Sequence, residues 1–139
     1  MSSLSQLFHH RWAPAVLAEL HRTRGSRVVT LTNVLGVGRE SLRRTLAALV
    51  DGGLVERNPG YGHPLRPEYV LTARGVRAAP ACADLLAGLR ELGVEGTALK
   101  KWSLPVLLAL GGPGRRRFSA LLEALPDVTP RALALALKD

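Results

Sequence analysis

The sequence predicts a mainly helical α+β fold, with three helices followed by a two-stranded hairpin and then by a partial copy of the helices. Apolar residues recur at helical spacing through most of the chain. The first part is also repeated: RWAPAVLAEL, beginning at Arg11, is matched by KWSLPVLLAL, beginning at Lys101. A repeat of this length indicates two related small domains rather than a solenoid of short units.

Ten apolar positions of the first copy recur in the second. Seven pairs are 90 residues apart and, after one extra residue at Asp127, three are 91 apart. The pairs are Trp12–Trp102, Val16–Val106, Leu17–Leu107, Leu20–Leu110, Val28–Phe118, Leu31–Leu121, Leu35–Leu125, Val37–Val128, Leu42–Leu133 and Leu46–Leu137. The second copy stops before the hairpin, so we expect one domain over residues 1–92, a short polar joint at 93–97 and a partial copy over 98–139.

The helices of the first copy follow from spacing and from end signals. Trp12, Val16, Leu17 and Leu20 share one face of a helix over 11–22, with Pro14 in its first turn. A short helix is expected over 28–35, then a tight Gly-Val-Gly turn. The third helix, over 39–51, places its leucines inward and ends at a Gly-Gly pair.

A hairpin and a long helix complete the first copy. Residues 54–57 and 68–71 are predicted to form antiparallel strands, joined by a Gly- and Pro-rich loop. Thr72 has the character of an N-cap for a helix that continues to about Leu92, and Pro80 is expected to kink or split it. This order of elements is that of a winged helix-turn-helix, whose second helix of the pair can enter a major groove.

Composition favours a polyanionic partner. The 19 Lys and Arg against 11 Asp and Glu give a net charge of +8, and all but three of the basic residues are Arg. Frequent Arg in a GC-rich genome is the alternative explanation. No run reaches the ~18 apolar residues of a membrane span, and the N-terminus lacks a signal-peptide pattern. A single Cys excludes an internal disulfide, so we expect a cytoplasmic protein without membrane contact.

The first copy resembles the HxlR-type bacterial transcription regulators, which are related to the MarR group. Three motifs carry the resemblance: Arg11-Trp12, then LAALVDGGLVER, then PEYVLTARG. They cover most of residues 11–90, and Lys101-Trp102, Arg117-Phe118 and VTPRAL repeat part of this text in the second copy. The resemblance implies a homodimeric repressor or activator that binds DNA near the bacterial nucleoid.

The predicted DNA-binding residues lie on the third helix, in front of the second helix and on the wing. Arg reads guanine edges or contacts phosphate, and Ser and Thr do either more weakly. The predicted set is Arg27, Gly38, Arg39, Ser41, Arg43, Arg44, Thr45, Arg57, Tyr61 and Arg66. A solvated basic face is the alternative.

The second copy is predicted to serve association rather than base reading. Its last helix carries one Arg among Ala and Leu, and Leu133 and Leu137 are expected to face its own core while Leu135 cannot. The predicted dimer interface is Leu85, Leu89, Leu133 and Leu135. Arg115-Arg116-Arg117 is either a second phosphate contact or a solvated loop.

The remaining candidates favour structural roles. His9, His10 and His21 lack carboxylate or thiol partners in the sequence, so no metal site or cofactor is predicted. Cys82 is expected to be a small buried apolar residue, and Trp12 and Trp102 to anchor cores. No catalytic constellation appears, which predicts no enzyme. The alternative function is a module that binds a small apolar or aromatic molecule, or a partner protein; such an effector could also switch DNA binding.

Overall fold

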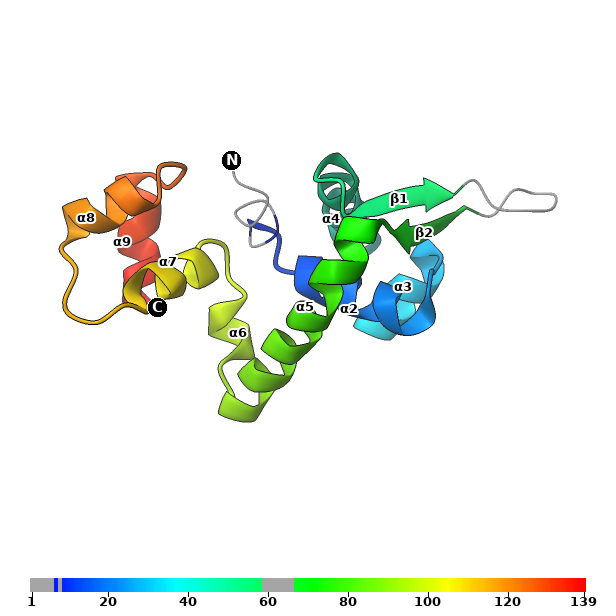
Figure 1. Ribbon diagram of the computed structural model, residues 1–139, viewed down its shortest axis with the longest axis horizontal. Helices are drawn as coiled ribbons and strands as arrows, with labels where there is room; N and C mark the ends of the chain where they lie inside the picture. Colours follow the sequence, from blue (N-terminus) through cyan, green and yellow to red (C-terminus); the bar gives the residue numbers. More distant parts are fainter. Residues whose placement is uncertain (1–6, 8, 59–66) are drawn as a thin grey trace.

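The computed structural model describes residues 7, 9–58 and 67–139. The described chain is mainly helical, with one two-stranded antiparallel sheet, and has the winged helix-turn-helix fold (Figure 1). The first domain contains α2 (Ala13–Thr23), α3 (Val28–Leu35), α4 (Arg39–Asp51), β1 (Val55–Asn58), β2 (Glu68–Leu71) and α5 (Ala73–Leu92). The expected helices and strands are therefore confirmed to within two residues at each end.

The turn between α3 and α4 is set by two glycines around a buried valine. Gly36 ends α3 with φ 64°, a left-handed conformation that glycine adopts without steric cost, and its N–H donates to the Thr32 carbonyl. Val37 is 7% exposed and packs into the core, which fixes the turn. Gly38 is the N-cap of α4. The two helices are thus held as a helix-turn-helix pair.

The hairpin is joined to the helical part by a third segment of extended backbone. β1 and β2 pair with Val55 opposite Leu71 and Asn58 opposite Glu68. Ser26, in the connection between α2 and α3, forms an isolated antiparallel bridge to Tyr69 of β2. The N-terminal side of α3 is consequently fixed beside the base of the hairpin.

The start of α5 is fixed by a side-chain cap and a close backbone approach. The Thr72 hydroxyl accepts from the Gly75 N–H at 3.1 Å and donates to the Gly53 carbonyl at 2.7 Å, which confirms Thr72 as the N-cap. A Cβ on Gly75 would collide with the carbonyl oxygen of Leu54. Pro80 does not split α5, which is one helix from Ala73 to Leu92.

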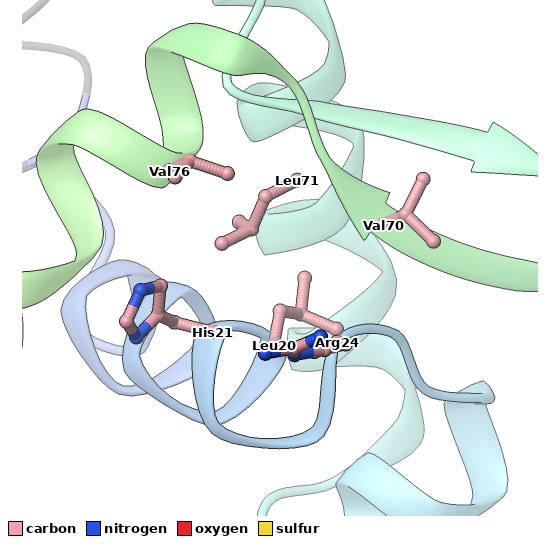
Figure 2. Close-up of a pocket in the computed structure, with 6 residues that line it drawn as sticks. All are labelled: Leu20, His21, Arg24, Val70, Leu71 and Val76. Atoms are coloured by element: carbon pink, nitrogen blue, oxygen red, sulfur yellow. The ribbon is translucent and has the colours of Figure 1, made fainter.

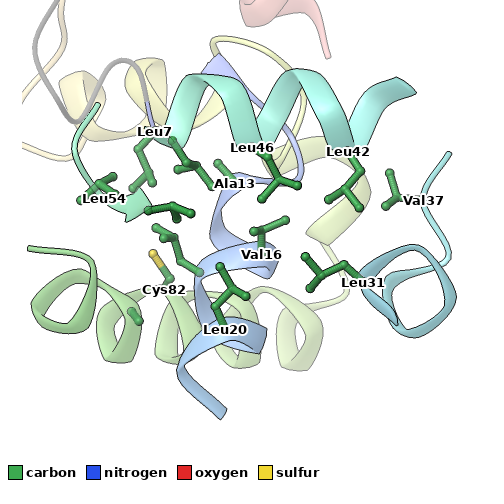
Figure 3. Packing of buried hydrophobic residues seen from close by; sticks show 14 residues of the cluster. Leu7, Ala13, Val16, Leu20, Leu31, Val37, Leu42, Leu46, Leu54 and Cys82 are labelled. Atoms are coloured by element: carbon green, nitrogen blue, oxygen red, sulfur yellow. The ribbon is translucent and has the colours of Figure 1, made fainter. Parts of the chain in front are cut away.

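One apolar core unites the first domain. α2 lies between α4 and α5, and the leucines of α4 point towards it (Figure 3). Val16, Leu17 and Leu20 of α2 and Leu42 of α4 are fully buried, and Leu46 is 1% exposed. Leu54 and Val55 of the hairpin and Ala79 and Cys82 of α5 close this core, with Trp12 packed against it.

The expected polar joint is in part a helix. α6 (Glu95–Ala98) follows the left-handed Gly93 that ends α5. Ala98 and Leu99 are buried against Leu86 and Leu89 of α5. The end of α5 therefore packs against the start of the C-terminal helices, as the lower part of Figure 1 shows.

The C-terminal part forms three helices with a small core of its own: α7 (Ser103–Leu110), α8 (Phe118–Ala124) and α9 (Pro130–Lys138). That core consists of Val106, Leu121, Val128 and Leu133, and Trp102 packs against it. Each of the four is the repeat partner of a core residue of the first domain. The expectation for Leu137 is wrong: it is 44% exposed, whereas its partner Leu46 is buried.

Candidate nucleic-acid interface

α4 separates its leucines from its charges. Leu42, Leu46 and Leu49 are buried, whereas Arg39, Ser41, Arg43 and Arg44 are exposed. Periodicity explains this arrangement, because positions three or four apart share a helix face. The helix therefore presents three guanidinium groups to solvent from a well-packed base.

The arginines of α4 differ in their partners. Arg44 forms an ion pair with Glu40 one turn earlier, at 3.8 Å, and both side chains are 71% exposed. Such exposed pairs contribute at most about 1 kcal/mol and dissociate easily. Within the described part of the chain, Arg39 and Arg43 make no ion pair. Their charge is available to an external anion.

Thr45 is a correction to the predicted set. It is 2% exposed, and its hydroxyl donates to the Ser41 carbonyl oxygen at 2.9 Å. Position 45 follows Leu42 by three residues, so it lies on the buried side of the helix. Its hydroxyl is therefore satisfied within the helix and buried from solvent.

Arg27 lies beside the base of the hairpin. Its Nε is 3.9 Å from Oε1 of Glu68 at the start of β2, and both side chains are 45% exposed. The Ser26–Tyr69 bridge places the two residues together. The structure thus joins two parts of the predicted site that are far apart in sequence, the front of α3 and the hairpin.

The predicted wing residues are only partly within the described structure. Arg57 is exposed on β1, opposite Tyr69. Tyr61 and Arg66 lie outside the described residues. Gly38 is exposed at the start of α4, where its backbone is open to solvent.

The last helix, α9, has a different surface from α4. Thr129 caps it by accepting from the Ala132 N–H at 3.1 Å, and Leu133 is fully buried. Arg131 is its one exposed arginine, and Ala134, Leu135 and Leu137 are exposed. α9 therefore lacks the cluster of donors that α4 presents.

Three of the four leucines predicted for a dimer interface contact other residues of their own chain. Leu133 is the fully buried centre of the C-terminal core, and Leu89 is 8% exposed against α6. Leu85 is half-buried against the same cluster. The sequence did not show that α6 folds back on α5 and covers Leu89. The interface itself stays a prediction. Leu135 is 57% exposed.

Sequence reasoning missed a pocket between α2, β2 and α5. It has a volume of about 340 Å³ and is lined by Leu20, His21, Arg24, Val70, Leu71 and Val76. Figure 2 shows the ring of His21 and the side chain of Val76 on opposite sides of this space. Because its walls come from three separate segments, no local motif could have indicated it.

The histidines and the cysteine have structural surroundings. His9 packs edge-on against Trp102, with ring centroids 5.2 Å apart. Burial, then the charge of Lys101, lowers the pKa of both His9 and His10, and His10 also lowers that of His9. Cys82 is 4% exposed, as expected, and burial raises its thiol pKa.

Metal-binding groups and membrane-spanning helices are absent from the described residues. No group of three His, Cys, Asp or Glu among them is placed to hold a metal ion. Within residues 7, 9–58 and 67–139, no helix has both the length and the hydropathy needed to cross a bilayer.

The model of the HxlR-like helix-turn-helix family matches residues 7–93. The chain belongs to this family. The matched region includes α2 to α5 and the hairpin, and the match does not extend over residues 98–139. The interpretation of those residues as a second, truncated copy therefore stays a prediction.

Two curated proteins are similar to this chain, and one of them is a transcriptional regulator. The chain is 39% identical over 120 residues to the HTH-type transcriptional regulator PetP of Rhodobacter capsulatus, covering 83% of this chain and 68% of PetP. It is 31% identical over 130 residues to the tRNA 5-methylaminomethyl-2-thiouridine biosynthesis bifunctional protein MnmC of an Azoarcus species, covering 84% of this chain but 19% of that protein. No solved structure matches the chain significantly.

Proposed function

We propose that this HxlR-like protein is a sequence-specific regulator of transcription that binds double-stranded DNA as a homodimer, with α4 of each protomer in a major groove. The exposed arginine face of α4 carries this proposal. It presents Arg39, Arg43 and Arg44 from a helix whose opposite face is fixed in the core. A base-reading helix needs this combination, since a mobile donor loses more freedom on binding than a fixed one.

The residues around α4 have complementary roles in this proposal. Arg27 and Arg57 contact phosphates on either side of the groove, which positions the protein without specifying sequence. DNA then competes with Glu68 for Arg27 and with Glu40 for Arg44. Breaking either ion pair costs little free energy, because all four side chains are exposed.

The role is one of binding rather than catalysis. The family match over residues 7–93 supports this, and the similarity to MnmC involves less than a fifth of that protein. No cofactor is invoked, because a regulator of this kind acts through the affinity of two surfaces.

A charge-matched comparison tests DNA binding. Arg43→Glu with Arg44→Glu should abolish binding to the gene's own upstream region in a fluorescence titration. Arg77→Glu with Arg131→Glu changes the net charge equally but alters exposed arginines on α5 and α9, so it should leave most of the affinity. Equal losses would show that only overall charge matters. A wild-type protein that binds no DNA would reject the proposal.

A second candidate function is ligand response, favoured by the pocket between α2, β2 and α5. It combines the apolar Leu20, Leu71 and Val76 with the polar His21 and Arg24, which suits a small, partly apolar molecule. Such a ligand would contact β2 and thereby the hairpin. Val76→Trp should fill the pocket and remove any ligand-dependent change in DNA affinity, whereas unchanged ligand response in that variant would exclude this location.

A further inference from the structure

The C-terminal helices carry more positive charge than their length explains. Residues 98–139 contain seven Lys and Arg against three Asp and Glu, which gives +4 of the chain's net charge of +8. The other 97 residues carry the remaining +4, with twelve basic residues and eight acidic ones. The net positive charge per residue is therefore more than twice as high in the C-terminal part, which the family model does not match.

Three of these charges are consecutive in the connection between α7 and α8. Arg115, Arg116 and Arg117, which we call the arginine loop, are all exposed. Within the described part of the chain, none of the three side chains makes an ion pair or a hydrogen bond. Lys100, by contrast, pairs with Asp139 at 3.1 Å. Neighbouring like charges repel one another, so the arginine loop is stabilised when an external anion neutralises it.

The repeat places Arg117 where the first domain has a proposed phosphate contact. Arg117 follows Arg27 by 90 residues, and each is the N-cap residue of the corresponding helix, α8 or α3. The backbone angles agree, with φ −87° and ψ 156° at Arg27 and φ −76° and ψ 154° at Arg117. The two side chains therefore start from equivalent positions. Arg27 pairs with Glu68 at 3.9 Å, whereas Arg117 has no acidic partner among the described residues.

The chemistry of the arginine loop suits a phosphate backbone better than a protein surface. The four residues before it are Gly111-Gly112-Pro113-Gly114, which offer no large side chain for the apolar core of a protein interface. Affinity for a DNA backbone comes instead from Lys and Arg that neutralise phosphates. A guanidinium group also donates two parallel hydrogen bonds to phosphate oxygens. Such contacts position a protein on DNA without reading its sequence.

We propose that the arginine loop is a second phosphate-binding surface, which holds the backbone of double-stranded DNA beyond the bases that α4 reads. The inference rests on the proposed function, since α4 must first place the protein on DNA. Leu99 and Leu104 pack against the end of α5, which fixes the C-terminal helices relative to the first domain. Figure 1 shows α8 and the hairpin at opposite ends of the molecule. The contact therefore extends the bound duplex away from the wing.

Duplex length tests this placement. A long duplex carries the whole upstream region, and a short duplex ends at the outermost base pairs whose substitution weakens binding. Arg116→Ala with Arg117→Ala should weaken binding to the long duplex at least about tenfold near 100 mM salt, because only the long duplex offers the additional phosphates. Binding to the short duplex should hardly change. Arg77→Ala with Arg131→Ala, which removes the same charge from exposed positions on α5 and α9, should have little effect on either duplex.

Salt dependence shows whether the lost contacts are to phosphate. Each lost contact should lower the slope of log affinity against log salt by about 0.9 on the long duplex. The variant of Arg116 and Arg117 should also lose affinity by the same factor for a specific and a scrambled long duplex, because phosphate contacts do not distinguish sequences. An unchanged slope, or a loss confined to the specific sequence, overturns the proposal.

A measurement on the unaltered protein guards against an indirect effect of the substitutions. The long duplex should protect the arginine loop from modification by phenylglyoxal, followed by mass spectrometry, whereas the short duplex should not. Equal modification with both duplexes overturns the proposal. The proposal is also overturned if the two substitutions leave DNA binding unchanged but abolish binding to vesicles of anionic phospholipid, since the loop would then serve a membrane surface.

Failure of the DNA-binding proposal gives a different result. If the wild-type protein binds neither duplex, the proposed function is rejected, and this inference with it. If Arg43→Glu with Arg44→Glu abolishes binding while Arg116→Ala with Arg117→Ala behaves like the wild type on both duplexes, the function stands and the second phosphate-binding surface is rejected.

Discussion

Ser26 and Tyr69 exchange both of their backbone hydrogen bonds, at 3.0 Å from the Ser26 N–H and 2.8 Å from the Tyr69 N–H. This bridge joins the α2–α3 connection to β2, and it places Arg27 beside Glu68. The front of α3 and the base of the hairpin consequently form one unit. A substitution that disturbs either segment should therefore disturb the other.

Gly25 precedes this bridge in a backbone conformation that favours glycine. It has φ +133°, which L side chains rarely adopt, and an added Cβ would lie 3.1 Å from Val70. Gly25→Ala should therefore lower the free energy of unfolding by about 1–3 kcal/mol in urea. Gly38→Ala is the control, because Gly38 has φ −64° and open space around it. Similar losses in the two variants would contradict this explanation.

Two glycines of α5 should respond in opposite directions. Gly75→Ala forces a methyl group against the Leu54 carbonyl, so unfolding should become easier by about 3 kcal/mol or more. A Cβ on Gly88 would meet nothing within 4 Å, and Gly88→Ala should stabilise by up to about 1 kcal/mol through helix propensity. Thermal and urea unfolding measure both, and a harmless Gly75→Ala would contradict the close approach seen here.

Comparing Arg43 with Arg131 tests whether α4 contacts bases while α9 has only a structural role. If Arg43 reads a base edge, Arg43→Ala should weaken specific binding by about 1–3 kcal/mol. Arg131 lies on α9 and is the repeat counterpart of Glu40. Arg131→Ala should weaken DNA binding much less. Titration with specific and scrambled duplexes measures the difference. Equal losses at the two positions would mean that α9 also contacts DNA.

Phosphate contacts should make binding depend strongly on salt. If Arg27, Arg43, Arg44, Arg57 and Arg66 contribute in both protomers, roughly 6–10 contacts form per dimer. Affinity should then fall about a thousandfold or more between 50 and 200 mM salt. Arg27→Ala should reduce the slope of affinity against salt. A flat response would reject this set of contacts.

Stability should decline in mild acid because of His9 and His10. Burial first, and then the charge of Lys101, lowers the pKa of each below 6.5 in the folded state. The unfolded chain therefore binds more protons than the folded chain. The stability contributed by the two neutral histidines is fully present above pH 6.5 and is lost as the pH falls through their folded pKa values. Replacing both histidines with Gln should make the melting temperature depend less on pH between about pH 7 and 5. An unchanged slope would exclude them.

Local signals in the sequence are enough to predict the helices and strands of the first domain. Helical spacing, the Gly-Gly end of α4 and the Thr72 cap are local signals, so α4 and β2 were predicted with their observed bounds. The outward arginines of α4 followed from the same spacing. The outward placement of Thr45 was wrong. Its spacing from Leu42 and Leu49 puts it on the buried face, and a polar side chain is accommodated there because its hydroxyl donates to the Ser41 carbonyl oxygen.

Which apolar residues are covered depends on contacts between segments that are distant in the sequence. Leu89 has the sequence character of an interface residue, but α6 folds back and covers it. Leu46 and Leu137 are equivalent in the repeat, yet one is buried and the other exposed, because a leucine's surroundings depend on which distant segment packs on it. Sequence periodicity shows which side of a helix is apolar, whereas only the assembled chain shows whether anything covers that side.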